Sequence, residues 1–236
     1  MKAMILAAGR GERLRPLTDT TPKPLLQAGG RALIEWQIAA LVAGGFDELV
    51  INHAWLGALI EAWLGDGSRY GARIRYSPEQ EALETLGGIT KALPLLGDQP
   101  FVVVSADIHT DYDYARLTPI VHRIAAHGGP IAHLVLTDNP PYNPSGDMAL
   151  IDGPHGARIA QSAADAPRLN YGNIGVFHPR MFTGLPRGQK QKLFPWVYRF
   201  QDEPGISGEH FRGAWHNIGT AGQLAALDEQ LRHRRA

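Results

Sequence analysis

A glycine-rich, basic loop near the N-terminus has the residue types of an anion-binding site. The apolar run Met4 to Ala8 leads directly into Gly9, Arg10, Gly11, Glu12 and Arg13. Glycines let a backbone pass close to an anion and present its N–H groups to it, and Arg13 adds positive charge. The loop lacks the third glycine of a dinucleotide fingerprint and the Gly-Lys-Ser/Thr of a Walker loop. It therefore predicts a phosphate site of another kind, although a Gly-x-Gly alone is more often a surface turn.

A second cation follows in Pro22-Lys23-Pro24-Leu25. The flanking prolines restrict the backbone around Lys23, so its ammonium group is held with less freedom than on an ordinary loop. Together with the glycine loop, this block is a much more specific indication of phosphate binding than either segment alone.

A carboxylate, Asp107, follows the strand-like run Phe101–Ser105. A carboxylate at the carboxyl end of a buried parallel strand is well placed to hold Mg2+ beside phosphates. From its position alone, a loop or helix-capping aspartate is the better interpretation. Asp111 and Asp113 are nearby, and we expect them in solvated-loop and helix-start roles.

The elements that must position these groups alternate along the first half of the chain. Apolar runs predict strands over Lys2–Ala8, Glu48–Asn52, Ala72–Tyr76, Phe101–Ser105 and Ile131–Leu136. Helical periodicity predicts helices over Arg31–Ala43, Leu56–Leu64, Leu86–Leu95 and Asp113–His127. This order predicts an α/β fold with a Rossmann-like, mostly parallel sheet flanked by helices. Ligands in such sheets bind beyond the carboxyl ends of the strands.

From about Thr137 the composition shifts towards Pro, Gly and Asn. Short strands over Met148–Ile151 and Gly172–Phe177 predict a smaller antiparallel extension, and Ala221–Arg235 predicts a C-terminal helix with a basic end. No linker or repeat separates the segments. We therefore predict a single domain over residues 1–236, divided into a first half (1–136), a second half (137–220) and a C-terminal helix (221–236).

The overall composition excludes several classes of protein. The 236 residues contain 23 Lys+Arg and 23 Asp+Glu, giving a formal net charge of zero, so no global charge attracts nucleic acid or an anionic membrane. The absence of cysteine excludes disulfides and thiolate metal sites. No apolar segment approaches membrane-spanning length. These features predict a cytoplasmic protein whose partners are small molecules, not nucleic acid or membrane.

The N-terminal motifs carry a family resemblance. Leu6-Ala7-Ala8-Gly9-x-Gly11-x-Arg13-Leu14-x-Pro16-Leu17-Thr18, followed by Pro22-Lys23-Pro24-Leu25, resembles the sugar nucleotidyltransferases. These enzymes join a nucleoside triphosphate to a sugar 1-phosphate and release pyrophosphate. The resemblance implies nucleotide contacts at Leu6, Ala8, Gly9 and Gly11, and catalytic charges at Arg13 and Lys23. Glu12 departs from the Thr or Ser that is usual in the family.

The resemblance also implies a magnesium site. Asp107 matches the family's metal-binding aspartate, although Ala106 stands where a glycine is usual. The second metal ligand of the family corresponds to Asn217, within Trp215-His216-Asn217-Ile218-Gly219-Thr220. Many relatives have Asp at this position. An amide oxygen can coordinate Mg2+ without bringing negative charge. The acceptor phosphate is already ionised, so the reaction requires positioning and charge neutralisation and no general base.

Base and sugar contacts follow from weaker matches. Glu79 is the candidate acceptor for a uracil N–H, with Gly88 allowing the backbone to approach the ring, although Glu79 as a charged helix entry is nearly as good an interpretation. Gly146 and Asn173 match the sugar-side segments of the family. The family's sugar-side lysine is missing near Gln161.

Leu83-Glu84-Thr85-x-Gly87-Gly88 and Asn143-Pro144-x-Gly146-Asp147 resemble short bacterial members of the family. Those members transfer a uridylyl group from UTP to N-acetylmuramic acid 1-phosphate in cell-wall peptidoglycan recycling. Alternatives are a mannose 1-phosphate guanylyltransferase, another enzyme acting on a nucleoside triphosphate and a sugar 1-phosphate, or a nucleotide-sensing module without turnover. Asn217 and the missing lysine keep the last alternative open. We expect a monomer or a small homo-oligomer.

Overall fold

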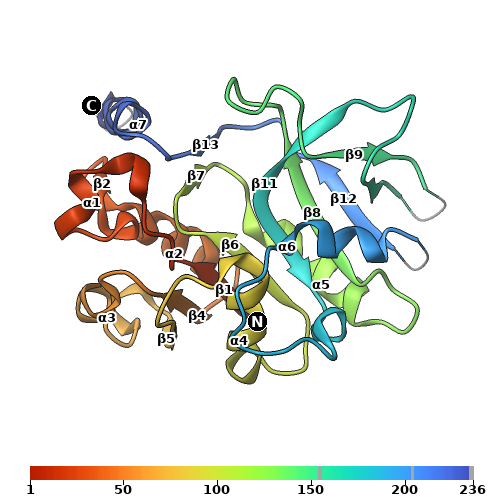
Figure 1. Ribbon diagram of the computed structural model, residues 1–236, viewed down its shortest axis with the longest axis horizontal. Helices are drawn as coiled ribbons and strands as arrows, with labels where there is room; N and C mark the ends of the chain where they lie inside the picture. The colour runs from red at the N-terminus through yellow and green to blue at the C-terminus, as the bar shows by residue number, and fades with distance from the viewer. Residues whose placement is uncertain (154–155, 203–204, 234–236) are drawn as a thin grey trace.

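The computed structural model describes residues 1–153, 156–202 and 205–233 (Figure 1). Its centre is a nine-stranded mixed sheet. Four parallel strands form the first half of the sheet, in the spatial order β5 (Arg73–Pro78), β4 (Glu48–His53), β1 (Lys2–Leu6) and β6 (Phe101–Ser105). Leu6, the last residue of β1, is in register with Asn52 on one side and Ser105 on the other. The carboxyl ends of three neighbouring strands therefore meet at one edge of the sheet.

The second half of the chain extends the same sheet. The order continues from β6 through β11 (Arg168–Phe177), β8 (Ala132–Thr137), β12 (Ile206–His210), β10 (Arg158–Ala160) and β9 (Met148–Ile151). β11 is antiparallel to both β6 and β8, while β8 and β12 are parallel. The predicted α/β fold with an antiparallel extension is confirmed. The predicted strand near Ile131 lies beyond β11, so β8 is not a direct neighbour of the parallel strands.

Strand β1 is buried on both faces, which explains its nearly continuous apolar sequence. Ala3 and Ile5 belong to one core and Met4 to the other. The first core is covered by α2 (Leu33–Ala43), α3 (Gly57–Leu64) and α5 (Thr118–Ala125), and the second by α4 (Glu84–Leu96) and α6 (Leu193–Trp196). Each fully buried Leu or Ile side chain contributes roughly 1.5–3 kcal/mol, so the two cores fix the strand ends firmly.

A third, smaller core joins the two ends of the chain. The short strands β7 (Ile108–Thr110) and β13 (Trp215–Asn217) pair antiparallel, and α7 (Ala221–His233) lies beside β2 (Gln27–Ala28), which pairs with β3 (Arg31–Ala32) (Figure 1). Leu14, Ile218 and Leu227 are buried together in this core. The C-terminal segment is therefore held against the glycine-rich loop. Residues 234–236, which include the end of the predicted C-terminal helix, lie outside the described residues.

Element boundaries differ from the predicted ones where side chains act on the backbone. The strands Phe101–Ser105 and Met148–Ile151 begin and end as predicted. The predicted helix over Asp113–His127 is instead a short 3-10 turn, Tyr114–Leu117, followed by α5. Asp113 caps that turn by accepting a hydrogen bond from the Ala115 N–H at 3.0 Å, which agrees with its expected helix-start role. None of the described helices combines the length and apolar character needed to cross a bilayer.

Candidate active site

A cleft of about 450 Å³ opens at the carboxyl ends of β1, β4 and β6. We call it the first cleft. It is lined by Leu6, Asn52 and Ser105 at the strand ends, by the glycine-rich loop and by Asp107. Seven residues that the sequence predicted as nucleotide, catalytic or metal contacts line it together: Leu6, Ala8, Gly9, Gly11, Arg13, Lys23 and Asp107. The fold therefore gathers the predicted phosphate-binding groups in one place.

The glycine-rich loop folds back onto the segment that carries Lys23. Gly11 has a positive φ of 71°, and a Cβ there would lie 3.0 Å from Thr18 Cγ2 and 3.2 Å from Lys23 Cβ. The Thr18 hydroxyl donates a hydrogen bond to the Gly11 carbonyl at 2.9 Å. Glycine is required here both by the backbone conformation and by the close approach. This packing brings the loop and the lysine to the same cleft.

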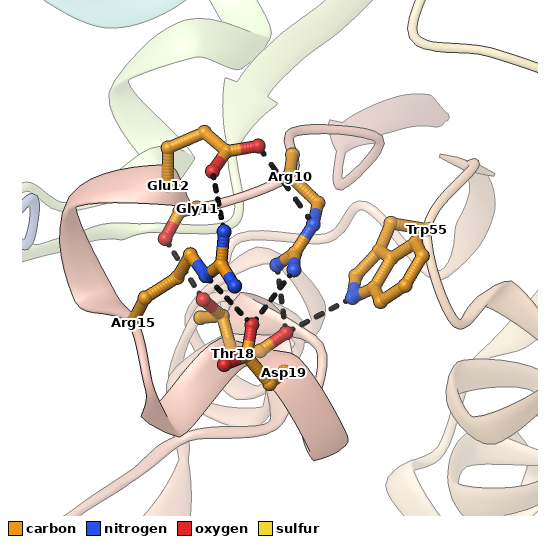
Figure 2. A network of polar contacts seen from close by, with 7 residues as sticks. All are labelled: Arg10, Gly11, Glu12, Arg15, Thr18, Asp19 and Trp55. Atoms are coloured by element: carbon orange, nitrogen blue, oxygen red, sulfur yellow. Dashed lines mark hydrogen bonds and ion pairs between the residues drawn. The ribbon is translucent and has the colours of Figure 1, made fainter.

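A polar network fixes the loop to α1 (Leu17–Thr20), as Figure 2 shows. The guanidinium of Arg10 lies over the Trp55 ring, 4.1 Å from its centroid, and donates to the Thr18 carbonyl at 2.7 Å and to Asp19 Oδ1 at 2.9 Å. Trp55 Nε1 donates to the same carbonyl at 3.0 Å, and Arg15 also pairs with Asp19. The loop is therefore held in place by contacts within the protein.

Two cations stand beside Asp107. Lys23 Nζ forms an ion pair with Asp107 Oδ2. Arg13 packs against Gly219, where a Cβ would lie 2.7 Å from the guanidinium Nη2. A side chain at Gly219 would therefore displace the Arg13 guanidinium, a contact that the sequence did not reveal. Both cations line the first cleft, where they can neutralise a phosphate chain.

Asp107 and Asn217 are brought together by the β7–β13 pairing. Asn217 is in register with Ile108, and the Ile218 N–H donates to the Asp107 carbonyl at 2.8 Å. Asn217 Oδ1 is buried and accepts no hydrogen bond from any described residue. A buried, unsatisfied amide oxygen is costly unless a cation or donor completes it. The pair thus fits a hard cation.

The ligand number also fits Mg2+. No group of three or more His, Asp or Glu side chains suited to holding a metal is present among the described residues. Mg2+ is often bound by only one or two protein ligands, with substrate phosphates and water completing its shell. Tyr142 lies beside the site, where the Asn217 side-chain amide donates towards the tyrosine oxygen and leaves Asn217 Oδ1 unpaired. Burial raises the pKa of Tyr142, so this hydroxyl stays protonated.

Glu79 and Gly88, the predicted base contacts, lie behind the wall of the first cleft. The Glu79 carboxylate is buried and accepts hydrogen bonds from Asn52 Nδ2 at 2.7 Å and from the Leu83 N–H at 2.9 Å. Burial raises the pKa of Glu79. A Cβ at Gly88 would lie 2.8 Å from Asn52 Nδ2. Neither residue is among those lining the first cleft; both lie behind Asn52, which does line it.

Asn52 was missed by the sequence analysis. Its Oδ1 accepts the Ala7 N–H at 3.0 Å, so its side chain joins the start of the glycine-rich loop to Glu79. The available signal was its position at the end of a parallel strand, where ligands of this fold class bind.

A second cleft, also about 450 Å³, adjoins the first. Both are lined by Leu6, Glu84, Thr85 and Ser105, so they are continuous. The predicted residues Gly146, Asn173 and Asn217 line the second cleft. Asn173 and Glu84 both have positive φ, 56° and 60°, which is uncommon outside glycine. Backbone strain of this kind is concentrated at functional sites.

The walls of the second cleft include aromatic and charged residues that the sequence analysis did not assign to the site. Tyr171, Phe194 and Tyr198 form an aromatic wall with ring centroids 5.5 Å apart in successive pairs. Arg168 and Lys192 also line it. Gln161, near which the family lysine was expected, does not; its carbonyl accepts a hydrogen bond from Arg168 Nη1 at 2.8 Å. Any cation in this cleft therefore comes from other segments.

Comparison with known proteins agrees with this geometry. Residues 2–146 match the nucleotidyl transferase family. The chain is 47% identical over 225 residues to an N-acetylmuramate alpha-1-phosphate uridylyltransferase from Neisseria meningitidis serogroup B, covering 95% of each chain. It is 31% identical to a protein of the same name from Caulobacter vibrioides, covering 97% of this chain and 96% of that one.

A solved structure supports the fold. A Bacillus anthracis protein in complex with sucrose superposes with a TM-score of 0.82 at 19% identity, covering 98% of this chain and 95% of the other. The resemblance seen in the N-terminal motifs is thereby confirmed, and the chain belongs to the nucleotidyl transferase family.

Proposed function

We propose that this enzyme transfers a uridylyl group from UTP to N-acetylmuramic acid 1-phosphate, releasing pyrophosphate. The observation that carries the proposal is the position of the candidate metal pair. Asp107 lines only the first cleft and Asn217 only the second, yet a backbone hydrogen bond joins their segments. A donor nucleotide in one cleft and an acceptor in the other would meet at this pair.

The first cleft suits the triphosphate. Backbone N–H groups of Gly9 and Gly11 and the charges of Arg13 and Lys23 favour an anionic chain there. In the proposed reaction, an oxygen of the acceptor phosphate attacks the α-phosphorus, and the bond to pyrophosphate breaks in line. Arg13 and Lys23 neutralise charge on the leaving group. Asp107 and Asn217 would hold Mg2+, which when bound supplies further charge neutralisation.

We assign base positioning to Asn52. It lines the first cleft, whereas Glu79 and Gly88 lie behind it. Glu79 fixes the amide orientation by accepting from Asn52 Nδ2. Glu79 and Gly88 would therefore act on the uracil through Asn52 and not by direct contact.

The second cleft suits the sugar. Asn173 and the backbone at Gly146 offer polar contacts, while Tyr171, Phe194 and Tyr198 offer an apolar wall against which a pyranose face or an acetyl methyl can pack. Both clefts are formed within one chain, which is consistent with a monomer or a small homo-oligomer. We also propose one domain, with nucleotide contacts mainly in residues 1–136 and sugar contacts mainly in 137–220, acting in cytoplasmic peptidoglycan recycling.

The test is pyrophosphate release with Mg2+ for the four nucleoside triphosphates, each paired with a panel of sugar 1-phosphates. We expect the highest kcat/KM for UTP with N-acetylmuramic acid 1-phosphate. Higher kcat/KM for GTP with mannose 1-phosphate would replace the substrate assignment. Tight nucleotide binding without release from any pair would contradict catalysis and favour the sensing module.

A further inference from the structure

The segment before α6 is clamped across the start of α4. The Gln191 N–H donates to the Leu83 carbonyl at 3.0 Å, and the Gln191 carbonyl accepts from the N–H groups of Leu86 and Gly87 at 3.0 and 3.1 Å. A Cβ at Gly87 would lie 2.2 Å from the Gln189 carbonyl oxygen, so this crossing requires glycine. Lys192 follows the hydrogen-bonded Gln191 and precedes the buried Leu193. The backbone on both sides of Lys192 is therefore held in place.

Lys192 is a cation without a partner inside the second cleft. Its side chain lines that cleft and makes no hydrogen bond or ion pair within the described part of the chain. An unneutralised ammonium group at the edge of a concave site attracts an anion. Lys190, two residues earlier, lines the first cleft instead. The clamped segment thus supplies one cation to each cleft.

The other charged groups of the second cleft are already engaged or have the opposite sign. Arg168 donates to the carbonyls of Gln161 and Asp147. The Asp147 carboxylate accepts from Asn143 Nδ2 at 2.9 Å and from the Tyr171 N–H at 2.8 Å. Glu84 is anionic. Arg168 is thus held by its carbonyl bonds, whereas Lys192 is the cation of this cleft that makes no hydrogen bond or ion pair within the described residues.

The position of Lys192 indicates which part of the acceptor it meets. The acceptor phosphate has to reach the α-phosphorus beside Asp107, which lines the first cleft and not the second. Lys192 lines the second cleft and not the first, so it faces a part of the sugar away from carbon 1. N-acetylmuramic acid carries a lactyl ether carboxylate on carbon 3 of its ring, which N-acetylglucosamine lacks.

Resting on the function proposed above, we propose that Lys192 binds a carboxylate on the acceptor sugar, remote from its 1-phosphate. Lys192 then selects acidic sugar 1-phosphates over uncharged ones.

The experiment compares N-acetylmuramic acid 1-phosphate with N-acetylglucosamine 1-phosphate in wild type, Lys192→Met and Lys192→Arg. The readout is the ratio of kcat/KM for the two acceptors in one preparation, which does not depend on the folded fraction. We expect Lys192→Met to lower this ratio by about 10- to 100-fold, through KM for the acidic acceptor, because a charge-assisted hydrogen bond is lost. Lys192→Arg should retain most of the ratio. Arg187→Met, which removes an exposed charge from the same segment outside both clefts, is the matched control.

An unchanged ratio in Lys192→Met would overturn the inference. Equal losses of kcat/KM with both acceptors would assign Lys192 to the phosphate that the acceptors share, or to folding. A similar fall in Arg187→Met would also overturn it. The acceptor preference of the wild-type enzyme alone shows whether the proposed function fails. If wild-type enzyme prefers another acceptor to N-acetylmuramic acid 1-phosphate, the substrate assignment fails, and this inference fails with it.

Discussion

The two clefts are built in different ways. The first is formed by the ends of neighbouring parallel strands and one contiguous loop. Some of its polar groups are already paired, Lys23 with Asp107 and Asn52 with Glu79 behind it. The second is assembled from separate segments around β11, and it presents an unpaired cation, Lys192. We infer that the first cleft is preorganised for chemistry common to all substrates, while the second determines which acceptor is used. Changes in the first cleft should therefore act on every substrate pair, and changes in the second on the acceptor alone.

The largest effect is expected for Asp107→Ala. It removes a proposed metal ligand and leaves Lys23 without its ion-pair partner. We expect kcat to fall by about 1,000-fold or more with every nucleotide and acceptor, because charge stabilisation at the reacting phosphates is lost. Pyrophosphate release measures this, with melting temperature as a check on folding. Asp98→Ala is the control, since Asp98 is exposed and its only described contact is with Gln99 at 3.5 Å. A rate within tenfold of wild type for Asp107→Ala would place the metal elsewhere.

Gly219→Ala tests the packing of Arg13. The added Cβ would lie 2.7 Å from Arg13 Nη2, so the guanidinium has to move. A displacement of about 1 Å in a catalytic group can lower the rate by about 100-fold, and we expect a kcat loss of about 10- to 100-fold that is equal for both acceptors. Gly222→Ala on α7 is the matched control, because a Cβ there meets nothing within 4 Å. If the loss depended on the acceptor, the division of roles between the clefts would be contradicted.

Asn52→Ala should affect stability and nucleotide binding together. The change leaves the Ala7 N–H and the buried Glu79 carboxylate without their Asn52 partner. We expect the free energy of unfolding to fall by about 1–3 kcal/mol and KM for UTP to rise, with little change in KM for the acceptor. Denaturant titration and steady-state kinetics measure the two effects. Asn139→Ala is the comparison from the second half of the chain. The exposed side-chain amide of Asn139 donates hydrogen bonds to the carbonyls of Pro144 and Arg168. A larger effect of Asn52→Ala on acceptor KM than on UTP KM would argue against base positioning.

Sequence reasoning located the parts of the first cleft that are local in the chain. Continuous apolar runs predicted the strand that ends at Ser105 and, two residues too long, the one that ends at Leu6. The glycine-rich loop and Lys23 lie within one short stretch and line the same cleft. Glu79 has the residue type expected of a base-reading acceptor, but no pattern shows that Asn52 and the Leu83 N–H already occupy its carboxylate.

The second cleft was less accessible because its residues are distant in the sequence. Lys192 becomes a cleft residue only through the clamp between Gln191 and α4, and Arg168 only because β11 lies next to β6. Neither arrangement leaves a local periodicity or a spacing motif. The proximity of Asn217 to Asp107 likewise depends on the β7–β13 pairing, and only the family resemblance indicated it.

The smallest effect concerns the part of the sheet that supports the second cleft. His133 on β8 is buried, with Nδ1 2.9 Å from Ser207 Oγ and Nε2 3.7 Å from Glu209 Oε1. Burial lowers the pKa of His133, despite the nearby Glu209. The unfolded chain therefore takes up this proton at a higher pH than the folded chain. The contribution of neutral His133 to the free energy of unfolding is fully present above the ordinary histidine pKa of about 6.5. It is lost as pH falls towards the lowered pKa of the folded protein, at up to about 1.4 kcal/mol per pH unit.

We expect His133→Gln, which cannot titrate, to show a flatter dependence of unfolding free energy on pH than wild type between about pH 7 and pH 5. Denaturant titrations at a series of pH values measure the slope, and parallel curves for the two proteins would contradict the assignment. His133 lines neither cleft, but β8 pairs with β11, which carries Tyr171 and Asn173. Because His133 lines neither cleft, His133→Gln should change the pH dependence of stability without changing the ratio of kcat/KM for the two acceptors at pH 7.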